Sequence, residues 1–246
     1  MTHPARTLVM IPTYQERENV ERILDRLHAA FPEAHALVVD DGSPDGTADL
    51  AEARARVDPR VHVLRRTEKN GLGAAYIAAM RWGITHGYPV LVEMDADGSH
   101  PPETLPAMVE ALDGPERPGL VIGSRWVDGG SVVNWPRSRE ALSRAGNAYA
   151  RIALGIDVRD ATAGYRVYRS ELLARIPLDD IVSHGYCFQV DMTLRVLDAG
   201  ESIAEVPIVF REREFGESKM SRAIVVEAML KVTQWGFARR ILRRSR

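Results

Sequence analysis

Residues 90–102 read Val90-Leu91-Val92-Glu93-Met94-Asp95-Ala96-Asp97-Gly98-Ser99-His100-Pro101-Pro102, and this stretch decides the fold. It begins with a short, mostly apolar run, which is typical of a strand buried on both faces of a parallel sheet. Two carboxylates follow, Asp95 and Asp97. Side chains at i and i+2 point to the same side of an extended chain, so both can converge on one cation. Such oxygen ligands suit Mg²⁺ or Mn²⁺, which take further ligands from water and substrate phosphates. The alternative is a solvated turn, because Asp and Gly are common turn residues.

The composition is that of an ordinary soluble protein. The chain has 246 residues, 45% of them hydrophobic and 27% charged, which fits one large domain or two small ones. The formal net charge of -2 argues against general nucleic-acid binding. The lone cysteine, Cys187, excludes an internal disulfide, fits a reducing compartment and is expected to be buried. The sequence shows neither a signal-peptide pattern nor an apolar run long enough to span a membrane.

Predicted strands and helices alternate along the chain on both sides of residues 90–102. We expect strands at residues 7–11, 35–40, 61–64 and 120–123, and helices at 16–31, 47–57, 71–86 and 103–112. This βαβ alternation predicts a mostly parallel sheet with right-handed crossovers and helices on both faces. Ligands of such folds bind beyond the carboxyl ends of the strands.

Two further motifs follow the first two predicted strands. The first is Pro12-Thr13-Tyr14-Gln15-Glu16, in which Thr13 and Glu16 have the spacing of a helix capping box. Tyr14 at a strand end could instead stack on a base or ribose. The second motif, residues 40–47, joins paired carboxylates to a Ser-Pro-Asp-Gly turn and to Thr47 as a helix N-cap. No Gly-x-Gly-x-x-Gly and no Walker A sequence occur, which weakens a dehydrogenase interpretation.

Together these motifs resemble family 2 glycosyltransferases of the GT-A fold. The likeness is carried by residues 12–16, by residues 40–47 and by Asp95-Ala96-Asp97. Three later motifs are similar to polyprenol (dolichol) phosphate mannose synthases: Gly123-Ser124-Arg125, Ala163-Gly164-Tyr165-Arg166 and Gly216-Glu217-Ser218-Lys219-Met220. The similarity covers about residues 6–220.

The resemblance implies roles for particular residues. The nucleotide, a guanosine, would be held by Pro12, Tyr14, Glu16, Val39 and Asp41, with Asp95, Ala96 and Asp97 beside its diphosphate. Asp95 and Asp97 would hold the metal, and Ser99 stands where some members have a glutamine ligand. A loop with Arg213, Ser218 and Lys219 would lie near the phosphates. An acidic residue near this region is the candidate base in many relatives, which makes Asp191 a candidate polar lining residue, and its role stays open.

The second half supplies positive charge for phosphate chemistry. Arg125 follows the predicted strand at 120–123, at the same sheet edge as the carboxylates. Arg139, Ser143 and Asn147 recur every four residues and share one face of a predicted helix. A single arginine on this face would favour the alternative interpretation, a helix face exposed to solvent. Arg125, Arg139 and Ser143 together favour an acceptor-phosphate pocket, because guanidinium groups bind phosphate oxygens bidentately.

The C-terminal part, residues 221–246, is predicted to be an amphipathic basic helix appended to a catalytic domain of residues 1–220. Five arginines lie among its last eight residues. Such a helix suits an anionic membrane surface, but a helix packed on the domain is an equal alternative, and both can hold together.

The expected reaction is an inverting transfer of mannose from GDP-mannose to a polyprenyl phosphate in a membrane, with Asp97, Arg125, Arg139 and Arg213 as catalytic residues and Mg²⁺ or Mn²⁺ as cofactor. Two alternatives are a polyprenyl-phosphate glucosyltransferase using UDP-glucose and a non-catalytic nucleotide-sugar binding module. We expect a cytoplasmic protein, peripheral at the cytoplasmic face of the membrane. A membrane-anchoring partner protein is compatible with this expectation.

Overall fold

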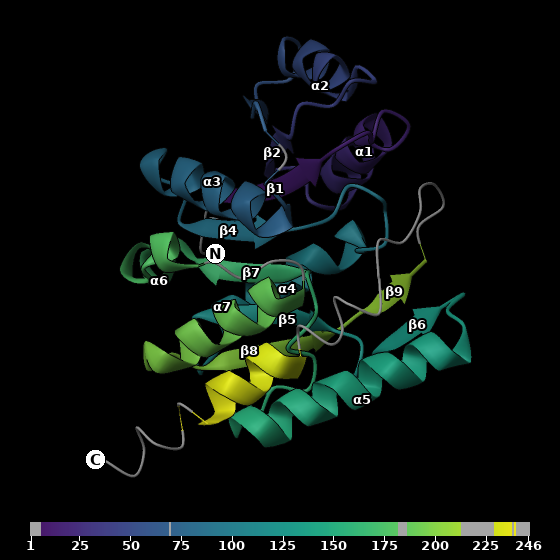
Figure 1. Cartoon of the computed structure of the whole chain (residues 1–246). Helices are drawn as coiled ribbons and strands as arrows, with labels where there is room; N and C mark the ends of the chain where they lie inside the picture. Colours follow the sequence, from purple (N-terminus) through teal and green to yellow (C-terminus); the bar gives the residue numbers. More distant parts are fainter. Residues whose placement is uncertain (1–5, 69, 182–185, 213–228, 238, 240–246) are drawn as a thin grey trace.

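A seven-stranded sheet forms the centre of the computed structural model, which describes residues 6–68, 70–181, 186–212, 229–237 and 239 (Figure 1). Its strand order is β3-β2-β1-β4-β7-β5-β8. The strands are β1 (Thr7–Thr13), β2 (His35–Asp40), β3 (Val61–Arg65), β4 (Val90–Glu93), β5 (Leu120–Ser124), β7 (Arg166–Arg169) and β8 (Ile203–Pro207). Only β7 runs antiparallel to its neighbours. The predicted mostly parallel sheet is confirmed.

Helices cover both faces of the sheet. One face packs against α1 (Val20–Ala30), α2 (Thr47–Ala55) and α4 (Leu105–Leu112), and the other against α3 (Leu72–Thr85), α5 (Arg137–Leu154), α6 (Ser170–Arg175) and α7 (Tyr186–Asp198). Side chains of a strand point alternately to the two faces, so Leu8 and Met10 enter one core while Val9 and Ile11 enter the other. The two cores, one on each face of the sheet, therefore both contain side chains of the same apolar strands. Short 3-10 turns lie at Pro102–Thr104 and Leu178–Asp180.

A second, two-stranded sheet consists of β6 (Ser131–Val133) and β9 (Val209–Arg211), which pair in parallel. The backbone of Ile208 separates β9 from β8, because its N–H bonds to Ser124 at 3.0 Å and its carbonyl accepts from Ser131 at 3.0 Å. The chain thus leaves the edge of the large sheet and places β9 beside the carboxyl ends of its strands.

The structure corrects the predicted capping box. Thr13 belongs to β1, and its hydroxyl donates to Asp40 Oδ1 at 3.1 Å instead of capping a helix. The helix begins at Val20 after Asn19, whose side chain donates to Glu16 at 2.7 Å. The capping-box interpretation was wrong because the Thr13 hydroxyl bonds to Asp40 of the neighbouring strand and the Glu16 side chain bonds to Asn19.

Residues 229–237 form a helix that packs along α5 (Figure 1). Val232 is buried, and Thr233 Oγ1 lies 2.5 Å from the hydroxyl of Tyr149. Leu230 and Phe237 are exposed by 66% and 62%. The packed part of the predicted C-terminal helix is therefore present, whereas the arginines of residues 240–246 lie outside the described residues. Within the described part of the chain, no helix is both long and apolar enough to cross a membrane.

Candidate functional site

The carboxylate loop, residues 95–99, follows β4 at the carboxyl end of the sheet. Tyr76 of α3 donates a hydrogen bond of 3.2 Å to Asp95 Oδ1. The backbone N–H of Asp95 donates to Nδ1 of His100 at 3.0 Å, so that nitrogen is unprotonated in the buried ring. Burial, and secondly the charge of Asp95, raises the pKa of Tyr76, so its hydroxyl stays a donor. Neither Tyr76 nor His100 was predicted, because the contact of Tyr76 depends on the packing of α3 and that of His100 on the conformation of the loop.

Asp97 lies in a turn of this loop instead of on the strand itself, which ends at Glu93. Its Oδ1 accepts a hydrogen bond of 3.0 Å from the backbone N–H of Ser99. Gly98 makes this turn with φ of 76°, a backbone region that favours glycine. Ser99 is only 3% exposed and Ala96 only 4%. The loop is therefore fixed on both sides of Asp97.

The donor set of the loop fits a magnesium or manganese ion. The side chain of Asp95 is 34% exposed and that of Asp97 is half-buried, so both carboxylates border solvent. Among the described residues no group of three or more His, Cys, Asp or Glu side chains could hold a metal. A site with two carboxylates suits an ion that takes its remaining ligands from water and substrate phosphates. The roles of Asp95, Asp97 and Ser99 as ligands stay predictions.

Glu93 lies fully buried beneath the loop and was not predicted as a functional residue. Gln189 of α7 donates to its Oε2 at 2.8 Å. Burial raises its pKa to about 7, and the nearby positive charge of Arg166 opposes this rise. This buried hydrogen bond joins α7 to the strand that carries the loop.

The paired carboxylates Asp40 and Asp41, of which Asp41 was predicted to bind guanosine, already have protein partners. Asp41 is 8% exposed and pairs with Arg66 at 2.7 Å. Asp40 accepts a hydrogen bond of 2.9 Å from the N–H of Ser43 and shapes the turn before α2. Arg66 was not predicted, because its pairing with Asp41 joins the ends of neighbouring strands.

The other predicted nucleotide residues lie at the carboxyl ends of β1 and β2. Tyr14 and Glu16 follow β1 and are half-buried, and Pro12 lies within it. Val39 is completely buried in β2, so its side chain belongs to the core. Only its backbone could then contact a ligand. Arg213, Ser218 and Lys219 lie outside the described residues.

Arg125 follows β5 and is 6% exposed. Its Nε and Nη2 donate to the two oxygens of the fully buried Asp160 at 2.8 and 2.7 Å. Nη2 also donates to Thr162 at 3.0 Å. Asp160 and Thr162 thus hold the guanidinium in one orientation. Its contact with an acceptor phosphate stays a prediction.

Arg139, Ser143 and Asn147 share a face of α5, as predicted. Asn147 is buried and donates to the carbonyl of Ser143 at 3.1 Å and to Thr162 at 3.0 Å. Arg139 is more accessible, with 21% of its side chain exposed, and pairs with Glu212 at 2.6 Å. The part of this face that carries Asn147 turns inward toward Arg125 and away from solvent. The alternative interpretation, a helix face exposed to solvent, is therefore excluded for Asn147.

Two residues of α7, Cys187 and Asp191, were also singled out from the sequence. Cys187 is buried, as expected. Asp191 pairs with Arg195 at 2.8 Å, and 14% of its side chain is exposed. This ion pair is a structural alternative to a catalytic role for Asp191.

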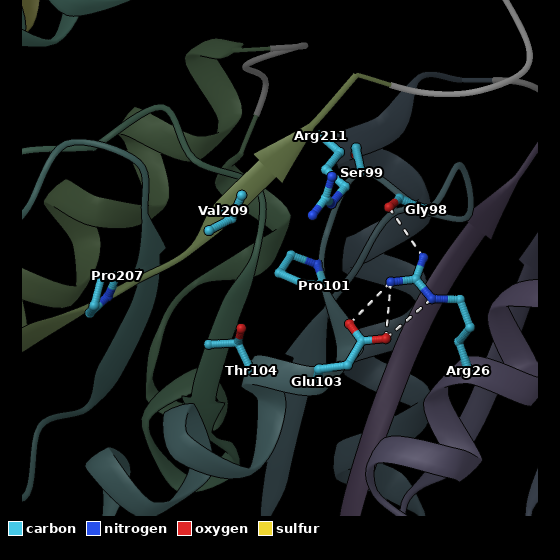
Figure 2. Close-up of a pocket in the computed structure, with 9 residues that line it drawn as sticks. All are labelled: Arg26, Gly98, Ser99, Pro101, Glu103, Thr104, Pro207, Val209 and Arg211. Carbon is cyan, nitrogen blue, oxygen red and sulfur yellow. Dashed lines mark hydrogen bonds and ion pairs between the residues drawn. The ribbon is translucent and has the colours of Figure 1, made fainter. Parts of the chain in front are cut away.

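A cavity of about 440 Å³ adjoins the carboxylate loop at Gly98 and Ser99 (Figure 2). Arg26 lies at its edge, donating to both oxygens of Glu103 at 3.1 Å and to the carbonyl of Gly98 at 3.4 Å. Arg211 lines it from β9. Among the described residues, Ser99 is the only predicted site residue in its lining, so this cavity is a neighbour of the candidate site.

Comparison with models of protein families shows which family the chain belongs to. The model of "Glycosyl transferase family 2" matches residues 8–176, which include the carboxylate loop and Arg125. The chain belongs to this family. This glycosyltransferase is 59% identical over 235 residues to an undecaprenyl-phosphate mannosyltransferase of Micrococcus luteus, with 96% of each chain covered. It is 56% identical over 237 residues to a polyprenol monophosphomannose synthase of Mycolicibacterium smegmatis, covering 96% of this chain and 89% of that one.

Solved structures confirm the fold of this glycosyltransferase. Glucosyl-3-phosphoglycerate synthase of Mycobacterium tuberculosis aligns with a TM-score of 0.69 at 21% identity, covering 94% of this chain and 80% of that one. A mannosyltransferase of Pyrobaculum calidifontis, solved with GDP-Man and Mn²⁺, aligns with a TM-score of 0.61 at 23% identity, covering 98% and 65%. At such identities the likeness extends to the GT-A-like fold alone.

Proposed function

We propose that this protein transfers mannose from GDP-mannose to a polyprenyl phosphate and inverts the anomeric carbon, as a polyprenyl-phosphate β-D-mannosyltransferase. The observation that carries this proposal is the 59% identity, over nearly the whole of both chains, to a relative named undecaprenyl-phosphate mannosyltransferase. The carboxylate loop and the arginines beyond β5 supply the two kinds of group that the reaction needs.

On the donor side, Asp95 and Asp97 would hold Mg²⁺ or Mn²⁺ at the diphosphate. The ion, when bound, supplies positive charge that stabilises the departing GDP. Tyr76 and His100 fix Asp95 from two sides, and the turn at Gly98 fixes Asp97. The nucleotide would be lined by Pro12, Tyr14, Glu16, Ala96 and the backbone of Val39. Asp41 would also contact it, held in place by Arg66.

On the acceptor side, the nucleophile is a phosphate oxygen that is already anionic at neutral pH. It needs no strong general base, unlike a hydroxyl acceptor. The difficulty is to bring two anionic substrates together, and fixed positive groups offset their repulsion. Arg125, Arg139 and Ser143 would contact the acceptor phosphate, with Arg125 held in its orientation by Asp160. Arg213 and Lys219 remain proposed contacts of the donor phosphates.

The membrane is the source of the acceptor, so we propose a peripheral association at its cytoplasmic face. Residues 1–220 would form the catalytic domain, and residues 221–246 would add the membrane-contacting helix. The exposed Leu230 and Phe237 and the basic tail support this division. Truncation after residue 238 should lower binding to anionic vesicles. Unchanged binding would mean that the tail makes no membrane contact, and an anchoring partner protein would become the better explanation.

The test of the function is a donor panel against one short polyprenyl phosphate. Labelled GDP-mannose, UDP-glucose and UDP-GlcNAc are supplied separately with Mg²⁺ or Mn²⁺, and the lipid product is counted. We expect transfer from GDP-mannose alone. Transfer from UDP-glucose would favour the glucosyltransferase alternative, and donor binding without any lipid product would favour the non-catalytic module.

A further inference from the structure

Strand β9 joins two parts of the candidate site that lie far apart in the sequence (Figure 1). The backbone N–H of Arg211 donates to the carbonyl of Ser99, in the carboxylate loop, at 3.3 Å. The next residue, Glu212, accepts the 2.6 Å hydrogen bond from Arg139 of α5, and its N–H donates to the carbonyl of Val133 at 3.2 Å. One short segment therefore contacts both the carboxylate loop and the arginine proposed to bind the acceptor.

A row of three aromatic rings makes the same connection through side chains. Trp135 meets Phe210 edge to face, with centroids 5.5 Å apart and an interplanar angle of 76°. Phe210 meets His100 in the same way, at 5.5 Å and 71°. His100 in turn accepts the hydrogen bond from the N–H of Asp95. We call Trp135, Phe210 and His100 the ring row. Edge-to-face contacts of this kind have a preferred geometry, so the row fixes its two ends relative to one another.

The far end of the ring row carries Arg139. Its guanidinium carbon lies 4.0 Å from the centroid of the Trp135 ring, well within the range of a cation–π interaction. The guanidinium carbon of Arg125 lies 5.6 Å from the same ring. The Nε1–H of Trp135 is buried and has no hydrogen-bond partner in the described part of the chain. Within the described part of the chain, the contacts of this side chain are made by its ring.

We propose that Trp135 is a positioning residue for the acceptor phosphate, acting through Arg139 and held in turn by Phe210. The inference rests on the proposed function, because it takes Arg139 as a phosphate contact. The ring face and Glu212 fix the guanidinium from two directions, so the phosphate meets it at a set distance from the carboxylate loop. Such placement matters because small displacements of a reacting group lower the rate strongly. An aliphatic side chain at position 135 offers neither the π face nor the edge-to-face contact.

The first experiment compares Trp135→Leu with Trp135→Phe in steady-state assays and in GDP binding. Loss of the cation–π contact predicts a rise of roughly tenfold in the acceptor KM for Trp135→Leu. The GDP dissociation constant should change less than about twofold, because the described contacts of Trp135, with Phe210, Arg125 and Arg139, include no proposed nucleotide residue. Trp135→Phe keeps a ring and should recover most of the loss. An unchanged acceptor KM, an equal loss of GDP affinity, or a failure of Phe to recover binding would each overturn the proposal.

A double-mutant cycle tests whether Trp135 acts through Arg139. If it does, Trp135→Leu combined with Arg139→Ala should have the same acceptor KM as Arg139→Ala alone. Fully multiplicative effects would show that the two residues act independently and would refute the positioning role. If Arg139→Ala itself leaves the acceptor KM unchanged, the acceptor assignment within the proposed function fails instead. The two failures are thus distinguishable.

The matched control is Trp82→Leu, which removes a half-buried tryptophan of α3 that packs against His62 and His86. It should lower thermal stability about as much as Trp135→Leu while leaving the acceptor KM unchanged. If Trp135→Leu does not fold, Phe210→Leu replaces it and should raise the acceptor KM in the same way. A Phe210→Leu enzyme with normal acceptor KM would then contradict the proposal.

Discussion

The carboxylate of Asp160 accepts three hydrogen bonds from Arg125, from the backbone N–H at 2.9 Å, from Nε at 2.8 Å and from Nη2 at 2.7 Å. Asp160 is completely buried and Arg125 nearly so. The carboxylate therefore fixes both the backbone and the guanidinium just beyond β5. This arrangement presents a positive group at the sheet edge in one orientation.

Replacing Asp160 by alanine should destabilise the fold strongly. The substitution leaves a buried guanidinium without its carboxylate, which typically costs about 3–5 kcal/mol. Urea unfolding at pH 7 measures the change in the free energy of unfolding. The control is Asp179→Ala, which breaks a surface ion pair with Arg81 and should have little effect. A loss for Asp160→Ala no larger than that of the control would show that Arg125 finds another partner.

Asp97→Ala should nearly abolish mannosyl transfer while the protein remains folded. Asp97 is half-buried in a loop outside the two apolar cores, so its carboxylate contributes charge and not packing. We expect a loss in kcat on the order of a hundredfold or more, because a stabilising charge at the leaving group is removed. Asp113→Asn, after α4, is the matched charge control and should keep full activity. A wild-type enzyme equally active in excess chelator would contradict the metal assignment.

Tyr76→Phe should weaken Mn²⁺ binding by roughly tenfold, because the hydroxyl orients Asp95 through the bond to its Oδ1. The measurement is a Mn²⁺ titration by electron paramagnetic resonance in the presence of GDP. Tyr165→Phe serves as the comparison, since that hydroxyl donates to the carbonyl of Pro101 and not to a carboxylate. Equal effects of both substitutions would mean that Tyr76 contributes packing alone.

The sequence predicted those features that depend on local pattern. The apolar runs and their flanking turns located β1, β2, β4 and β5, and the resulting parallel order placed Asp41, Asp95 and Arg125 at one edge of the sheet. The antiparallel β7 was missed, because two arginines flank its short apolar core and break the pattern. The partners of the site residues were missed for a different reason. Asp160 lies 35 residues from Arg125, and periodicity carries no information on such pairs.

A cluster of His35, His62 and Tyr88 lies away from the candidate site, at the first residues of β2 and β3 and just before β4. His35 Nδ1 lies 3.1 Å from His62 Nε2, and the hydroxyl of Tyr88 lies 2.9 and 3.2 Å from these two nitrogens. Burial lowers the pKa of both imidazoles below the usual value of 6.5. The charge of Arg6 lowers the pKa of His35 further, and the neighbouring His35 lowers that of His62.

This cluster predicts a loss of stability as the pH falls below about 6.5. In the unfolded chain both histidines bind a proton near pH 6.5, whereas in the folded chain they bind one only at lower pH. At these two histidines the unfolded state therefore holds more protons in this window, and the contribution of the cluster to the free energy of unfolding decreases as the pH falls through it. Urea unfolding between pH 8 and pH 5 measures the slope, and His62→Gln should flatten it because one titrating group is lost. A slope for His62→Gln equal to that of the wild type would assign the acid sensitivity to other groups.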